Sequence, residues 1–466
     1  MVAQPLKPDA KDFKFISIYG PCSKQGRGAN RSAKSHAVKQ ALKAKRLLEQ
    51  KSTHNFRVTL LKEHNTLINK SYFTNHPNLT PSLSASAIDP FGMLPVDTSR
   101  LQMLLGDSRA RKASEPVFSI TEELAFQNFH TVFRTGLTDP ALSNAVMFSL
   151  LFAVTEGNLD LECLKYKVCV IGCIRDKVAY IKGAVSESTI GAILLLVGVE
   201  AQMGMTSQVQ LHMAAVSQLL EISRSQGIYL TVGIKRAIFW RDLNASILSG
   251  SDRIVDHTTF SELLWRRDSF TPTFYQLPSG FEIISHLFSE DFLEILEDIY
   301  ALQCIRNCSS YKKGDPFFMS YINNHTAFIQ SRIVNLVIPS PMLKCCATAA
   351  YICSVMLCCH AWCALVIPSY LSSKLLDQLQ KAEKDTIWDE NSDLLLWLLY
   401  IGGTFASPGS VRSRYIDLLR TNITARFSLI CSSPSRILEI LRQFIWSDVA
   451  FFSDASMLWE EISNTY

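Results

Sequence analysis

Between residues 186 and 250 the pattern of apolar and polar positions predicts three successive helices. The first is almost uniformly apolar and extends to about Gly204, and Ser186 and Ser188 both offer an N-cap at its start. A helix that is apolar on every side is typical of the interior of a large helical core. This region therefore predicts a buried helix with two further helices around it.

The second and third helices of this region differ from the first because polar residues occupy part of their surface. In the second, expected at 207–225, four apolar residues recur at spacings of four, three and four and share one face. They are Val209, Met213, Val216 and Leu220. Gly227 is suited to end this helix in a left-handed conformation. The third helix is expected at 233–249, with Gly250 as its end.

This order of helices resembles the regulatory region of fungal zinc-cluster transcription factors, in which a helix with a His ends at a glycine turn and a Trp-x-Asp-Leu helix follows. The residues that carry the resemblance are His212, Gly227, Trp240, Asp242 and Leu243. A later segment, SDLLLWLLYIGGTFA, is similar to the Leu-Trp-Leu-Leu and Gly-Gly segment of that family through Trp397, Gly402 and Gly403. The resemblance spans roughly residues 115–460. Ordinary helices of an unrelated all-α protein are the alternative.

Three regions are expected along the 466 residues. Residues 1–52 form a basic arm that is disordered and partly helical, and 53–114 form a mostly irregular linker with several prolines. From 115 to 466 we expect one all-helical domain of the regulatory type. It begins with a capping box of Ser119 and Glu122, and loops with Pro and Gly separate its helices. No strand pattern alternates with the helices, so the expected class is all-α.

Residues 24–51 hold nine Lys or Arg against the single Glu49, although the whole chain has a net charge of only +4. The residues expected to contact nucleic acid or import receptors are Arg27, Arg31, Lys34, Lys39, Lys43, Lys45 and Arg46. Such an arm could contact phosphates weakly and without sequence specificity, act as a nuclear-import signal, or simply be solvated.

The defining motif of the similar family is missing. Its zinc cluster needs six closely spaced cysteines, and here Cys22 alone precedes residue 163. Of the thirteen cysteines, the densest group is Cys358, Cys359 and Cys363 with His360, in an apolar segment. There we expect buried, reduced thiols and neither a metal nor another cofactor.

Two further interpretations concern chemistry and membranes. No catalytic motif is present, so no enzymatic activity is expected. Trp240 and Asp242 are interpreted as architectural, with the ring in the core and the carboxylate meeting an Arg or a helix end. Residues 345–370 lack Asp, Glu, Lys and Arg, which would suit a membrane span, but their many Cys and Ala and the weak basic flanks favour a core helix.

The resemblance implies a nuclear regulator of transcription that acts by binding. Its expected partners are other proteins of the transcription machinery, or a protein that supplies a zinc cluster, together with a small-molecule effector and weak contact to DNA. The alternatives are a cytoplasmic helical scaffold or adaptor, and a membrane-associated protein that uses residues 345–370.

Overall fold

The computed structural model describes residues 92–113, 138–179, 185–267, 272–308, 316–357, 363–382, 386–427 and 434–463. All regular structure in these ranges is helical, which confirms the all-α class that the sequence predicts. Contacts divide the chain into two compact units, Met1–Pro77 and Asn78–Tyr466, and every described residue belongs to the second. The basic arm with its seven candidate residues lies outside the described part.

Two short helices lie in the described part of the expected linker at 53–114. They are α3 (Thr98–Gly106) and the 3₁₀ helix η1 (Ser108–Lys112). The Asp97 carboxylate begins α3 by accepting hydrogen bonds from two backbone N–H groups, and two leucines of α3 are buried. Both helices contact the next described helix. The sequence pattern does not predict α3, because nine residues are too few to show a sustained apolar period.

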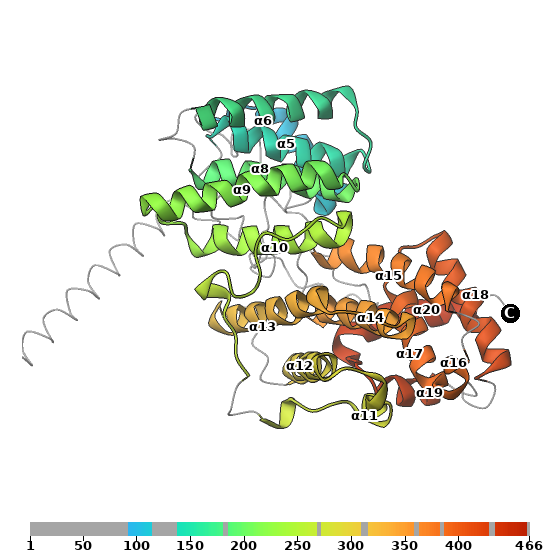
Figure 1. The fold of residues 1–466 in the computed structure, drawn as a ribbon. Helices are drawn as coiled ribbons and strands as arrows, with labels where there is room; N and C mark the ends of the chain where they lie inside the picture. Colours follow the sequence, from blue (N-terminus) through green and yellow to red (C-terminus); the bar gives the residue numbers. More distant parts are fainter. Residues whose placement is uncertain are drawn as a thin grey trace, which may run out of the picture. The chain divides into compact units, whose positions relative to one another are not determined.

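The first group of long helices surrounds α8, the apolar helix that the sequence pattern places in the core. The group consists of α5 (Pro140–Val154), α6 (Leu161–Ala179), α8 (Glu187–Gln202), α9 (Thr206–Gln226) and α10 (Val232–Ser249). Helix α8 contacts the other four, and every residue from Thr189 to Ala201 is buried (Figure 1). Helix α6 lies at the outer margin of this group, at the top of Figure 1.

The ends of these helices confirm the predicted signals. The Ser186 side chain accepts a hydrogen bond from the backbone N–H of Thr189 and caps α8. Gly227 and Gly250 end α9 and α10 with φ of 64° and 70°, values in the left-handed region that glycine tolerates best. Three of the four residues on the predicted apolar face of α9 are buried, and Leu220 is half-buried.

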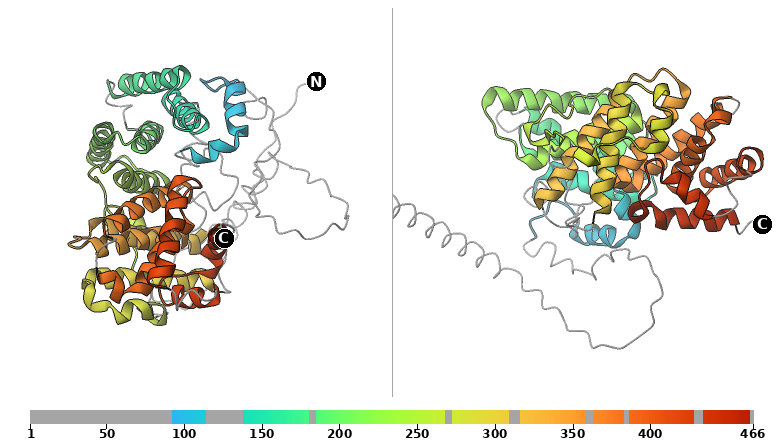
Figure 2. Two further views of the ribbon diagram at one scale, coloured as in Figure 1. Left: turned by 90° about the vertical axis from the view of Figure 1, so that its right-hand side faces the viewer. Right: turned by 90° about the horizontal axis from the view of Figure 1, so that it is seen from below.

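The second group is larger and has α14 and α17 at its centre (Figures 1 and 2). Its α-helices are α11 (Ser279–Ile283), α12 (Glu290–Asn307), α13 (Pro316–Asn335), α14 (Pro341–Leu357), α15 (Cys363–Lys381), α16 (Ile387–Glu390), α17 (Ser392–Thr404), α18 (Ser410–Ala425), α19 (Pro434–Leu441) and α20 (Asp448–Ser463). Three 3₁₀ turns precede α12: η3 (Ser261–Leu263), η4 (Pro272–Phe274) and η5 (Ser285–Leu287). Helix α10 joins the groups through contacts with α13 and α15.

The apolar segment at 345–370 is divided in the structure. Helix α14 ends at Leu357 and α15 begins at Cys363, and the residues between them lie outside the described part. Within α14 the thiols of Cys345, Cys346 and Cys353 are buried and unbonded, as the core interpretation predicts. None of the described helices combines the length and the apolar character needed to cross a membrane.

Candidate functional site: a groove between two surface helices

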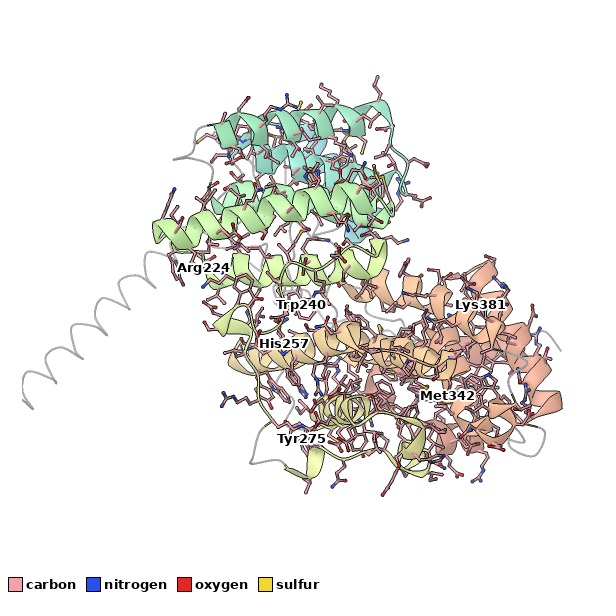
Figure 3. All side chains as sticks on the ribbon, in the orientation of Figure 1. Arg224, Trp240, His257, Tyr275, Met342 and Lys381 are labelled. Carbon is pink, nitrogen blue, oxygen red and sulfur yellow. The ribbon has the colours of Figure 1, made fainter. Side chains whose placement is uncertain are left out.

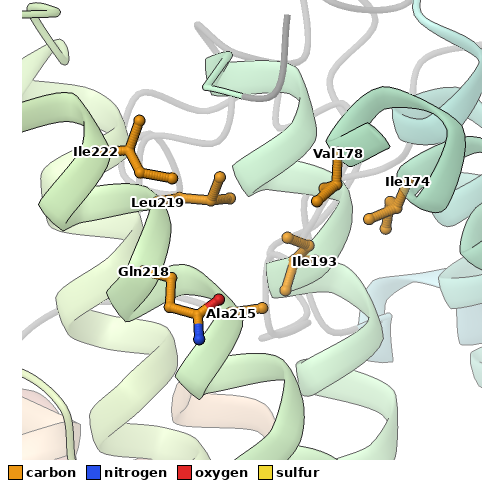
Figure 4. A pocket seen from close by; sticks show the side chains of 7 residues that line it. All are labelled: Ile174, Val178, Ile193, Ala215, Gln218, Leu219 and Ile222. Atoms are coloured by element: carbon orange, nitrogen blue, oxygen red, sulfur yellow. The ribbon is translucent and has the colours of Figure 1, made fainter. Parts of the chain in front are cut away.

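An apolar pocket of about 210 Å³ opens between α6 and α9 above α8. Figure 4 shows its lining, which comes from all three helices. The lining residues are Ile174, Val178, Ile193, Ala215, Gln218, Leu219 and Ile222. Ile193 of α8 and Leu219 of α9 are 2% and 5% exposed and form the floor. Gln218 is the one polar side chain of the lining, so the pocket suits an apolar group.

The groove exists because α6 and α9 both rest on α8 and have little direct contact with each other. On α6, Ile174 and Val178 are one turn apart and point into the gap (Figure 4). On α9 the small side chain of Ala215 leaves the space that a larger residue would fill. The pocket is therefore a consequence of residue sizes at the facing positions.

A buried carboxylate joins the same three helices outside the pocket lining. Glu200 of α8 is 1% exposed, and its Oε1 lies 2.9 Å from Nζ of Lys167 on α6. Its Oε2 lies 3.3 Å from Nε2 of His212 on α9, within ion-pair distance but without hydrogen-bond geometry. Burial would raise the pKa of Glu200, yet His212 and Lys167 together hold it below its ordinary value. The charged carboxylate thus joins α6, α8 and α9.

The ion-pair cluster of Glu200, Lys167 and His212 lies about two helical turns from the pocket. Glu200 and Ile193 are seven residues apart on α8, which corresponds to about 10 Å along the axis. Lys167 and Ile174 have the same spacing on α6. His212, the first residue of the family resemblance, therefore lies beside the groove, one turn from Ala215 on α9.

Trp240 and Asp242 of α10 are both buried. The Trp240 ring, labelled in Figure 3, is 4% exposed. Its Nε1 donates to Oδ1 of Asn323 on α13 at 3.3 Å. The Asp242 carboxylate accepts from Nε of Arg253 at 3.2 Å and from the backbone N–H of Ile254 at 3.0 Å. Burial outweighs these bonds and raises the pKa of Asp242. Together they fix the chain that follows α10.

Of the remaining residues of the resemblance, Gly227 is exposed and the others are buried. Leu243 is fully buried in α10, and Gly227 is the left-handed end of α9. In α17 the Trp397 ring is fully buried, and its Nε1 donates to the Ile445 carbonyl at 2.9 Å. Gly402 and Gly403 let the neighbouring helices approach α17 closely. Of this set, His212 is the residue on the same helix as the pocket residue Ala215, although it is not part of the pocket lining.

Sequence reasoning did not identify the pocket residues. Ile174, Val178 and Ala215 have ordinary helical spacing, and a one-dimensional pattern does not show which two helices stand apart. A weak signal was available in α6, where exposed apolar residues outnumber those that the core buries. That excess indicates a surface which the rest of the domain does not cover.

A second unpredicted feature is a buried imidazole in an aromatic cluster of the second group. His325 of α13 stacks on Trp265, with ring centroids 3.9 Å apart and planes 6° apart. Neither ring nitrogen of His325 has a hydrogen-bond partner within the described residues, and the same holds for Trp265 Nε1. Burial, assisted by Arg267, lowers the pKa of His325 to about 3. The two rings stack against each other in the interior and contribute to packing.

No protein-family model, curated protein or solved structure matches this chain. Among the residues that the structure describes, no three His, Cys, Asp or Glu side chains form a metal-binding group. The groove between α6 and α9 is therefore the candidate site on which a function can be argued.

Proposed function

We propose that this chain is a regulatory binding protein of the fungal transcription-factor type, acting in the nucleus through a protein partner. The observation that carries the proposal is the apolar groove between α6 and α9, which opens to solvent. In support, the helices at 187–249 have the order and ends on which the resemblance rests. A protein that supplies a zinc cluster is one proposed partner, because Cys22 is the one cysteine among residues 1–162.

The size of the pocket indicates the kind of occupant. Sites for drug-sized ligands measure about 300–1,000 Å³, and this pocket is smaller at about 210 Å³. It suits a single large apolar side chain, and the parallel walls of two helices suit a helix laid between them. The proposed partner segment is an amphipathic helix with one aromatic or branched anchor, and Gln218 offers a hydrogen bond at the rim.

The basic arm has a separate part in this proposal. Its seven Lys and Arg residues would direct nuclear import or add weak, salt-dependent contact to any duplex. Each phosphate contact would contribute about 0.9 to the slope of log affinity against log salt concentration. Deletion of residues 1–52 should reduce nuclear accumulation and leave the groove unchanged.

The test joins the full chain to an unrelated DNA-binding module upstream of a reporter gene. Ala215→Phe fills the pocket from within, and Ala214→Phe adds the same ring one position away, where the side chain is exposed. We expect the unsubstituted fusion to change reporter expression, Ala215→Phe to abolish that change, and Ala214→Phe to retain it. Both variants should match the parent in melting temperature and abundance.

Two outcomes would contradict the proposal. Equal activity of the two variants would show that the groove is not used. A silent fusion of normal abundance, found in the cytoplasm when tagged without the added module, would favour the cytoplasmic scaffold or adaptor.

A further inference from the structure

The outer face of α6 exposes large apolar side chains that the described residues do not cover. Leu161 is 85% exposed, Val168 is 69% exposed and Leu164 is 42% exposed. With successive residues 100° apart, these three fall within a single strip along the helix. Single exposed apolar residues are common on proteins, whereas a row of them on one helix marks an interaction surface.

Gly172 lies in the same strip of α6, and packing within the described residues does not require a glycine there. It is inside a regular helix, where glycine is less favourable than alanine. A Cβ atom built on Gly172 would meet no atom within 4 Å. The missing side chain therefore leaves the backbone open on the solvent side, next to Val168 one turn earlier. This combination permits close approach of an outside surface.

A positive and a negative side chain lie beside the strip. If two copies met across a two-fold axis, each of these charges would face the opposite charge of the other copy. Lys165 and Asp176 are exposed and lie on the same side of the strip. They are eleven residues, or about 16 Å, apart along the axis. Neither forms an ion pair with any residue that the structure describes. A two-fold axis near Val170 and Ile171 would set Lys165 of each copy against Asp176 of the other.

From these three observations we infer that the outer face of α6 is the contact between two copies of this chain. The two α6 helices run antiparallel, and Val168 of each copy packs over Gly172 of the other. Two Lys165–Asp176 pairs flank the apolar centre on one side. This inference rests on a different face of α6 from the groove and does not depend on the proposed function.

The interface is small, and its size sets the expected affinity. Helix α6 has 19 residues and is about 28 Å long, so one helix pair buries less than the roughly 1,200–2,000 Å² of a stable interface. The dimer is therefore a weak one that forms in the micromolar range.

Sedimentation equilibrium of the full chain from about 1 to about 200 µM tests this inference, because that range brackets a weak interface. Val168→Asp should raise the dimer Kd at least tenfold. Val449→Asp is the matched control, since Val449 is 67% exposed on α20 and should leave the Kd unchanged. Gly172→Gln should weaken the dimer without loss of thermal stability, because its Cβ meets nothing in the monomer.

The charge pair gives a second, independent readout. Lys165→Glu should weaken the dimer, and Lys165→Glu combined with Asp176→Lys should restore most of the affinity. A chain that is monomeric throughout the range would overturn the inference. So would a dimer that Val168→Asp and Lys165→Glu leave intact, because that dimer would use another surface.

Discussion

Two glycines inside helices show how differently two parts of this molecule are built. A Cβ on Gly402 of α17 would lie 2.3 Å from the Tyr415 hydroxyl oxygen, so no other residue fits there without movement of the aromatic ring. A Cβ on Gly172 of α6 would meet nothing within 4 Å. The first glycine is required by packing inside the domain. The second has no such requirement within the described residues.

The surroundings of the two glycines show the same contrast. Around Gly402 the Tyr415 hydroxyl donates to the Ser372 carbonyl at 2.7 Å, and every residue of α17 from Leu394 to Thr404 is buried. Around Gly172 the helix exposes apolar side chains on one face and borders the pocket on another. The comparison shows that α17 is buried by the rest of the domain. Helix α6 instead has an exposed apolar face and one wall of a pocket, both of which could bind another molecule.

The largest expected effect on stability comes from substituting Trp397, which lies in the buried helix α17. The ring is fully buried, and its one polar atom is hydrogen-bonded. Trp397→Ala should lower the free energy of unfolding by about 3–5 kcal/mol, measured by urea denaturation. The matched change Val168→Ala on α6 should alter it by less than about 0.5 kcal/mol, since its side chain is mostly exposed. Equal losses of unfolding free energy in Trp397→Ala and Val168→Ala would contradict the contrast between a buried α17 and an exposed face of α6.

Replacing each of the two glycines by alanine should change the free energy of unfolding in opposite directions. Gly402→Ala should cost about 3 kcal/mol, because Tyr415 must shift and its buried hydrogen bond weakens. Gly172→Ala should instead raise the free energy of unfolding by up to about 1 kcal/mol, the ordinary helix preference for alanine. Urea denaturation of both variants at protein concentrations below the dimer range measures this. Destabilisation by Gly172→Ala would indicate that α6 is packed from outside by part of this chain.

The buried imidazole of His325 should make the stability of the folded chain depend on pH under acidic conditions. Its pKa is about 3 in the folded chain and about 6.5 when unfolded, so the unfolded state binds more protons between these values. Stability is therefore complete above about pH 6.5 and falls as the pH decreases, by about 2 kcal/mol at pH 5. His325→Phe keeps a ring against Trp265 and should remove this part of the loss. Identical stability profiles from pH 8 to pH 5 for the two proteins would refute this role.

The sequence was sufficient for the parts of the fold that depend on local patterns. The helix class, the three helices at 187–249 and the glycine ends at Gly227 and Gly250 follow from periodicity and from backbone conformations that favour glycine. The structure places the Trp240 ring in the interior and the Asp242 carboxylate against Arg253. The short helix at 98–106 escaped prediction because it is too short to show a period.

The candidate site could not be predicted, since it depends on the distance between helices that are apart in sequence. Ala215 lines a pocket only because Ile174 and Val178 stand across a gap from it, and no pattern within α9 records that gap. The stacking of His325 on Trp265 likewise joins a helix to a loop 60 residues earlier. The basic arm lies outside the described residues, so its contacts with DNA or import receptors stay predictions.

The central claim, that the groove between α6 and α9 accepts a large apolar side chain, can be measured directly with indole as the probe. In chain labelled at isoleucine methyl groups, titration with indole should shift the methyl signals of Ile174, Ile193 and Ile222 along one saturating curve. The methyl signal of Ile401, fully buried in α17, should stay in place, and Ala215→Phe should abolish the shifts. The account would be contradicted by signals that do not move at millimolar indole, or by shifts of equal size at Ile401 and in the groove.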